Sequence, residues 1–176
     1  MKNDTPIYSD IISYIKTTQD LNEISSEIES LLVSIFETEN QSFDNALRSI
    51  NAETARKIKE TLAKNGLDIT NKSSTESVLD KEVIRNFLTG LKNLLGKFKT
   101  IRLIIAFEPS SQTIENIYNW VLSNLGQGYI LSIETNKAIL GGAIIVSSNG
   151  TYRDFTVKKS LEDTFLAKRK EISGLN

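Results

Sequence analysis

The sequence predicts an α+β fold: an N-terminal helical bundle, then a small α/β domain with a mixed sheet of about four strands and two helices. Apolar residues recur at intervals of three and four over most of residues 1–98, which is the period of amphipathic helices. After residue 98, short runs of β-forming residues alternate with two helical patterns. We therefore expect one domain over residues 1–98 and a second over residues 99–176.

Amphipathic segments in the first half are expected to form the bundle. They cover residues 7–15, 20–36, 43–50, 52–64 and about 75–98. Asp20 and Glu23 have the spacing of a capping box, which predicts Asp20 as the N-cap of the second helix. None of these helices buries its apolar side alone, so they should pack against one another.

Strand signals dominate the second half. The expected strands are residues 100–107, 129–134, 139–147 and 151–155, and the expected helices are residues 109–125 and 157–172. The first strand is a continuous apolar run, which predicts a buried strand. Pro109 is expected in the first turn of its helix, where proline is favoured. Gly141 and Gly142 interrupt the third strand, and Asn149-Gly150 predicts a hairpin turn. The first strand, helix and second strand can form a right-handed parallel crossover.

Composition excludes several classes of function. Charged residues make up 24% of the chain and apolar residues 39%, which is typical of a globular protein. The absence of cysteine and histidine excludes disulfides, Cys/His zinc sites and catalysis by imidazole. A net charge of -1 provides no basic field for nucleic acid or anionic lipid. No signal-peptide pattern and no run of about 18 apolar residues is present, so we expect no direct membrane insertion.

Two features resemble chemical sites, and each has a simpler structural interpretation. Gly141-Gly142 lacks the Gly-Lys-Ser/Thr of a phosphate-binding loop, so we expect a bulge or a close backbone approach. Asp154 has no second titrating group placed beside it, so we expect it to cap the last helix or to bond the turn backbone. The sequence therefore predicts no catalytic, cofactor-binding or metal-binding residue.

Charge is distributed unevenly along the chain. Residues 1–40 carry eight acidic and two basic residues, whereas residues 41–98 carry ten basic and seven acidic residues. We expect this asymmetry to pair helices within the bundle; the alternative is an acidic surface for a basic partner helix. The basic end of the chain is interpreted as a solvated helix face. Trp120 flanks an apolar helix side, where core packing is the expected role and an interface anchor is the alternative.

Three stretches carry a family resemblance. They are residues 103–110, residues 139–145 after a strand at 131–134, and residues 150–157 followed by Leu161. In order and spacing, residues 101–161 resemble the C-terminal domain of the delta subunit of F-type ATP synthase, the oligomycin-sensitivity-conferring protein family. The signature positions that this resemblance assigns are Phe107, Pro109, Gly141, Gly142, Gly150, Asp154 and Leu161.

The resemblance implies a non-catalytic subunit without cofactors that links the peripheral stalk to the catalytic head during proton-driven ATP synthesis. The bundle would bind N-terminal helices of the alpha subunit, and the α/β domain would bind the C-terminal helices of the stalk b subunit. The protein would then lie at the cytoplasmic face of the plasma membrane as part of the complex. Candidate interface residues are Ile7, Ile11, Tyr14, Trp120, Tyr152 and Phe165.

Two other classes of function remain as alternatives. A small nucleic-acid- or ribosome-associated binding module is compatible with helices followed by a small α/β domain, but the near-neutral charge argues against it. A hydrolase ranks third, because no nucleophile and base stand in a recognisable arrangement.

Overall fold

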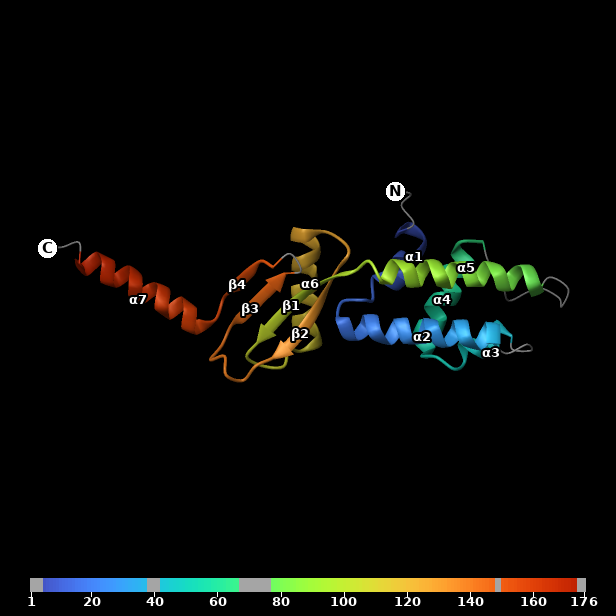
Figure 1. The fold of residues 1–176 in the computed structure, drawn as a ribbon, viewed down its shortest axis with the longest axis horizontal. Helices are drawn as coiled ribbons and strands as arrows, with labels where there is room; N and C mark the ends of the chain where they lie inside the picture. Colours follow the sequence, from blue (N-terminus) through green and yellow to red (C-terminus); the bar gives the residue numbers. More distant parts are fainter. Residues whose placement is uncertain (1–4, 38–41, 67–76, 148–149, 174–176) are drawn as a thin grey trace. The chain divides into compact units, whose positions relative to one another are not determined.

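The chain has the predicted α+β fold (Figure 1). The computed structural model describes residues 5–37, 42–66, 77–147 and 150–173. Its contacts divide the chain into two compact units. One unit comprises Met1–Ile15 and Gln19–Phe98, and the other comprises Lys16–Thr18 and Lys99–Asn176.

The described residues of the first unit form helices joined by turns and short irregular segments. Its helices are α1 (Thr5–Ile12), α2 (Thr18–Glu37), α3 (Phe43–Leu47), α4 (Ala52–Lys64) and α5 (Ser77–Leu95). The prediction that Asp20 is an N-cap is wrong, because α2 begins at Thr18 and Asp20 lies in its first turn. A carboxylate there still interacts favourably with the helix dipole.

The core of the first unit draws on all five helices and on Ile15, which lies between α1 and α2. Its largest fully buried side chains are Ile11, Ile15, Ile28, Leu31, Ile35, Ile58, Leu62, Leu88 and Leu91. Tyr8 packs on Phe87 with ring centroids 5.1 Å apart, and its hydroxyl donates to the Phe87 carbonyl at 3.2 Å. Gly90 makes room for this, because a Cβ there would meet the Tyr8 hydroxyl.

Ion pairs join the acidic start of the chain to its basic middle. Asp10 of α1 pairs with Lys64 of α4, and Glu29 of α2 pairs with Lys92 of α5 at 2.8 Å. These two pairs confirm the interpretation that the charge asymmetry joins helices within the bundle.

A four-stranded mixed sheet organises the second unit. Its strands are β1 (Lys99–Ile105), β2 (Tyr129–Thr135), β3 (Ala143–Ser147) and β4 (Tyr152–Asp154), in the order β2-β1-β3-β4. β1 and β2 are parallel and are joined through α6 (Ser111–Leu125), which confirms the predicted crossover. The other two pairings are antiparallel. The last helix, α7, covers Val157–Ser173.

Helix α6 covers one face of this sheet. Tyr118 and Val121 of α6 form a buried cluster with Ile101 of β1 and Leu131 of β2. Ser110 caps α6 by accepting the amide of Thr113 at 3.2 Å. Pro109 therefore precedes the N-cap and is not in the first turn, which corrects the prediction for that residue.

A short segment outside the second half completes the edge of the sheet. The Lys16 carbonyl accepts the Leu131 amide at 2.8 Å, and Thr17 forms a parallel bridge with Leu131. The Lys16 side chain also pairs with Glu115 of α6. Lys16–Thr18 therefore belongs to the second unit although it lies between α1 and α2 in the sequence.

Candidate partner-binding surfaces

The junction between the sheet and α7 is built around two glycines. Gly141 and Gly142 precede β3 and do not interrupt it, because that strand begins at Ala143. Gly142 has a φ of 88°, and a Cβ there would lie 2.8 Å from the Cα of Thr156. The Gly141 carbonyl accepts the Val157 amide at 3.0 Å. The pair is thus the predicted close backbone approach, and it holds the first residues of α7 against the sheet.

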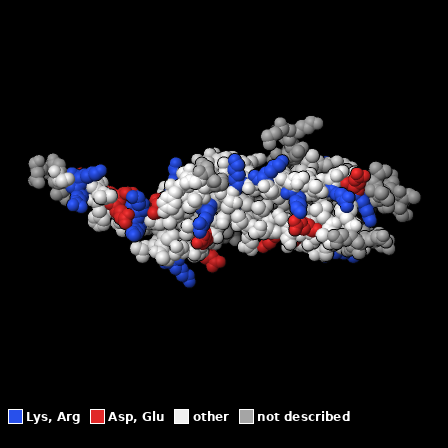
Figure 2. Space-filling view, in the orientation of Figure 1, with Lys and Arg blue, Asp and Glu red and all other residues white. Residues whose placement is uncertain are grey.

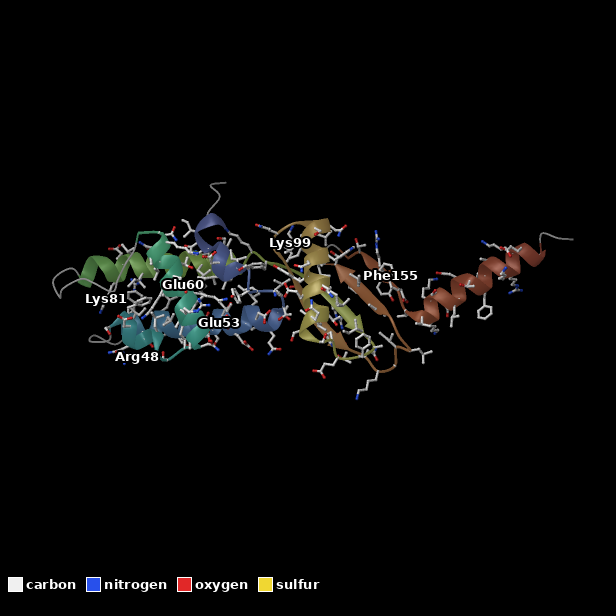
Figure 3. The ribbon with its side chains drawn as sticks, turned by 180° about the vertical axis from the view of Figure 1, so that it is seen from behind. Arg48, Glu53, Glu60, Lys81, Lys99 and Phe155 are labelled. Atoms are coloured by element: carbon white, nitrogen blue, oxygen red, sulfur yellow. The ribbon has the colours of Figure 1, made fainter. Side chains whose placement is uncertain are left out.

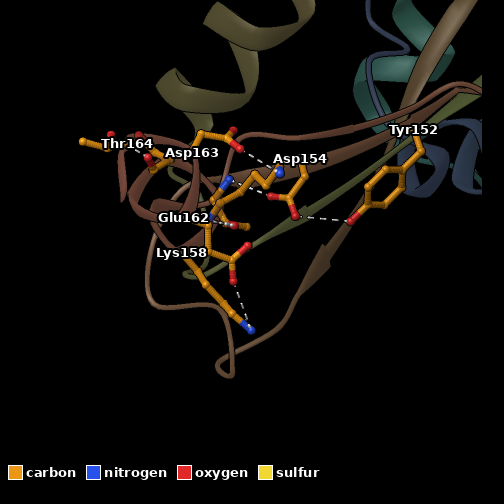
Figure 4. Close-up of polar contacts among 9 residues, drawn as sticks. Tyr152, Asp154, Lys158, Glu162, Asp163 and Thr164 are labelled. Atoms are coloured by element: carbon orange, nitrogen blue, oxygen red, sulfur yellow. Dashed lines mark hydrogen bonds and ion pairs between the residues drawn. The ribbon is translucent and has the colours of Figure 1, made fainter. Parts of the chain in front are cut away.

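Asp154 fixes the turn that leads into α7 (Figure 4). Its Oδ1 accepts the backbone amide of Thr156 at 2.8 Å, and Tyr152 donates to its Oδ2 at 3.4 Å. Thr156 in turn caps α7, because its hydroxyl accepts the Lys159 amide at 3.3 Å. Of the two roles predicted for Asp154, the structure shows the second, a bond to the turn backbone.

The same contacts perturb the titration of this carboxylate. Hydrogen bonds from the side chain and the amide of Thr156 hold the pKa of Asp154 below its ordinary value, with smaller contributions from Tyr152 and Lys159. Desolvation and the neighbouring Asp154 charge raise the pKa of Tyr152. Asp154 is therefore ionised at neutral pH, in a role that is structural.

Helix α7 begins against the sheet, where Val157 lies beside Gly141, and has an exposed surface beyond that point. All its side chains from 157 to 171 are exposed, including the apolar side formed by Val157, Leu161, Phe165 and Leu166. Phe165 is 70% exposed. Ion pairs within the helix, such as Lys159–Asp163 at 2.9 Å, support it locally. Such pairs add little, and most helices depend on packing of an apolar side, so α7 presents a surface suited to a partner.

The sheet has a second exposed apolar surface, which we call the open face. Its apolar side chains are Ile104, Ile144, Val146 and Tyr152, which strand alternation places opposite the α6 cluster. The same alternation places Arg102 of β1 and Glu134 of β2 on this face, where they form an ion pair. The three aliphatic side chains are half-buried, and Tyr152 is 58% exposed. Figure 1 views the sheet from this side, with α6 behind it, and in the same view Figure 2 shows both basic and acidic side chains over the sheet among uncharged ones. The prediction of a buried β1 is therefore correct for one face of the strand only.

The remaining signature positions lie in connections or on α7. Phe107, 59% exposed, and Pro109 lie between β1 and α6, and Gly150 lies between β3 and β4 with a φ of 83°. Leu161 is on the exposed apolar side of α7. The structure thus brings Gly141, Gly142 and Asp154 together at the base of α7. Asn149 of the predicted hairpin turn lies outside the described residues.

The candidate interface residues divide into surface and core. Ile11 is 1% exposed and belongs to the bundle core, so it is not available to a partner. Ile7 and Tyr14 are exposed in the first unit. Trp120 is 56% exposed on α6, which corrects the expectation that it packs in the core. Tyr152 and Phe165 are exposed on the open face and on α7 respectively.

A buried lysine in the bundle was not predicted. Lys57 of α4 is 6% exposed, lies over the ring of Tyr14, and pairs with Glu53 at 3.4 Å. Burial lowers the pKa of Lys57, with Glu60 and Asp10 acting in the opposite direction. It lines a pocket of about 180 Å³ with several carboxylates, including Glu53, which is labelled in Figure 3. The sequence signal for this burial is helical spacing: Lys57 and Thr61 lie next to Ile58 and Leu62 on the same side of α4.

Other kinds of site are not found in the described part of the chain. Among residues 5–37, 42–66, 77–147 and 150–173, no group of three acidic side chains is arranged to hold a metal ion. None of the helices described has the length and apolar content needed to cross a bilayer.

Comparison with known proteins adds no assignment. No protein-family model matches the chain, and no curated protein matches it.

Proposed function

We propose that this protein is a non-catalytic adaptor, the delta subunit of an F-type ATP synthase, which links the peripheral stalk to the catalytic head. The observation that carries the proposal is α7, whose apolar side chains are all exposed and whose base is built from residues that the family resemblance assigns. Gly142 and Asp154 hold the start of the helix through backbone contacts, so the helix projects from a defined point of the sheet. An adaptor that transmits force needs such a fixed attachment.

The partner proposed for the α/β domain is the C-terminal helical region of the stalk b subunit. Val157, Leu161 and Phe165 recur at four-residue intervals, the spacing with which one amphipathic helix packs against another. The start of α7 carries both signs of charge, in ion pairs between residues four apart, Lys158–Glu162 and Lys159–Asp163. Such a mixed-charge helix suits a partner helix that carries both signs of charge.

The partner proposed for the bundle is the N-terminal helical region of the alpha subunits in the head. The exposed side chains Ile7 and Tyr14 provide apolar surface in the first unit. In this role the protein is held at the cytoplasmic face of the plasma membrane by its partners.

Co-purification tests the proposal. The tagged full chain should retain both the stalk b subunit and the catalytic head when the three are mixed at micromolar concentration. Recovery of the chain alone, without either partner, would contradict the adaptor role. Retention of RNA instead, lost as salt rises, would favour a nucleic-acid-binding module.

A further inference from the structure

The open face of the sheet lacks the layer that such a face normally has. Parallel and mixed sheets with apolar residues on both sides are usually covered on both. Here α6 covers the side of Ile101 and Leu131, whereas Ile104, Ile144 and Val146 on the other side stay half-buried. Ile130 of β2 is buried, and Glu134 of β2 pairs with Arg102 on this side, so the uncovered apolar area lies on β1, β3 and β4 beside that ion pair.

The same unit carries one helix that covers nothing. Helix α7 has 17 residues and is about 25 Å long, close to the roughly 23 Å of the seven-residue strand β1. Its apolar side offers Val157, Leu161, Phe165 and Leu166, all exposed. Each chain therefore contains one uncovered sheet face and one unpacked helix of matching length.

The contacts at its base fix the point at which α7 leaves its own sheet. Three hydrogen bonds fix residues 155–157: Phe155 amide to Ala143 carbonyl at 2.8 Å, Thr156 amide to Asp154 at 2.8 Å, and Val157 amide to Gly141 carbonyl at 3.0 Å. Thr156 is buried in direct contact with Gly142. Figure 3 labels Phe155 at this junction, where the chain leaves the sheet. A return of α7 to the open face of its own copy would require these bonds to break, at a cost to their donors, or the helix to bend after Val157.

We propose that in the free protein α7 of one copy packs on the open face of a second copy, and that the second copy returns its own α7. The exchange is two-fold symmetric, so the open face and the α7 helix of each copy both contact the other copy. The exposed apolar side chains of both elements, counted twice, bury on the order of 1,200–1,600 Å², the size of a standard stable interface. The inference does not depend on the identity of the partners proposed above.

Sedimentation of the full chain alone over a range of concentrations tests the exchange. The chain should form a dimer, and the double variant Leu161→Glu/Phe165→Glu should raise the dimer dissociation constant by on the order of 100-fold. Both residues are exposed, so the variant keeps its fold. Leu140→Glu is the matched control, because Leu140 is 84% exposed and lies on neither α7 nor the open face; it should dissociate like the wild type. A wild-type chain that is monomeric, or a control that dissociates as strongly, overturns the proposal.

Cysteine pairs locate the contact, since the natural chain has no cysteine. Phe165→Cys mixed with Val146→Cys should give a disulfide-linked heterodimer on mild oxidation, whereas Phe165→Cys mixed with Leu140→Cys should not. A doubly substituted Phe165→Cys/Val146→Cys chain that closes as a monomer would show fold-back and overturn the exchange. Binding of monomeric chain to anionic vesicles through α7 would also overturn it, because the helix would then serve a lipid surface. Neither assay includes stalk or head subunits, so failure here leaves the co-purification result independent.

Discussion

Helices α6 and α7 belong to the same unit and both have an apolar side, although α7 is the more polar of the two, and they differ in what that side contacts. Helix α6 buries Tyr118 and Val121 against the sheet, whereas every described side chain of α7 from 157 to 171 is exposed. Both begin at a hydroxyl cap, Ser110 in one and Thr156 in the other. Amphipathic periodicity therefore identifies a helix that has a partner surface, but it does not say whether that surface lies in the same chain.

The largest expected difference comes from one aromatic residue on each helix. Tyr118→Ala should lower the free energy of unfolding by about 3–5 kcal/mol, because it empties a buried site in the α6 cluster. Phe165→Ala should change it by less than about 0.5 kcal/mol, because the ring is exposed. Urea denaturation of both variants measures the two values, and equal losses would show that α7 packs against its own unit. The dilute chain should be used, so that self-association does not contribute.

Substitution of Gly142 and of Gly150, which both have a positive φ, distinguishes the cost of backbone strain from the cost of a steric clash. Gly142→Ala should destabilise the second unit by about 2–3 kcal/mol, because the new Cβ meets the backbone of residues 155 and 156 and φ is positive. Gly150→Ala also adds strain at φ 83°, but nothing lies within 4 Å, so its cost should be about 1 kcal/mol. Thermal unfolding measures both, and an equal cost would remove the close approach as the reason for Gly142.

Removal of the N-cap hydroxyls of α6 and α7 tests whether each helix contributes to global stability. Ser110→Ala and Thr156→Ala should each cost their helix about 1 kcal/mol. The loss at Ser110 should appear in global unfolding, because α6 is part of the core. The loss at Thr156 should appear as faster amide exchange in the first turn of α7, with little change in global unfolding. Thr156→Ser is the control that keeps the hydroxyl and should exchange like the wild type.

Lowering the pH should weaken the hydrogen bonds at the start of α7 but not those at the start of α6. The folded-state pKa of Asp154 is lowered, so its stabilising contribution is complete above the ordinary carboxyl pKa and is lost as pH falls through the folded value. The Thr156 amide, which Asp154 accepts, should then lose protection from exchange, while the Thr113 amide, capped by a hydroxyl, should not. Exchange measured from pH 6 down to about pH 3 tests this, where the ordinary Asp pKa is about 3.9. Parallel loss at both amides would contradict it.

The sequence was sufficient for features that depend on local pattern. The change of period after residue 98, the parallel crossover and the close approach at Gly142 all follow from apolar spacing and from residue type. The caps at Ser110 and Thr156 and the start of β3 differ from the predictions, because ends of elements depend on a few bonds to neighbouring strands. Asp154 was correctly restricted to two structural roles, and only the geometry distinguishes them.

Contacts between segments that are distant in the chain could not be predicted from the sequence. Nothing in Lys16–Thr18 indicates that it would join the edge of β2, since the pairing involves residues more than 100 positions away. Lys57 was missed because a lysine on the buried side of a helix resembles a solvated residue. Ile11, on the apolar side of its helix, was expected at an interface but lies in the core, whereas Trp120, on the flank of its helix, was expected in the core but is exposed. In both cases only packing decides which part of the helix surface is covered.

The central claim is that α7 is the surface by which the protein binds the stalk. Titration of the stalk b subunit into the full chain, compared with the Leu161→Glu/Phe165→Glu variant, tests it most directly. The account predicts tight binding by the wild type and Leu140→Glu, and about a 100-fold loss of affinity in the double variant. Unchanged affinity in the double variant, with its fold intact, would contradict the claim.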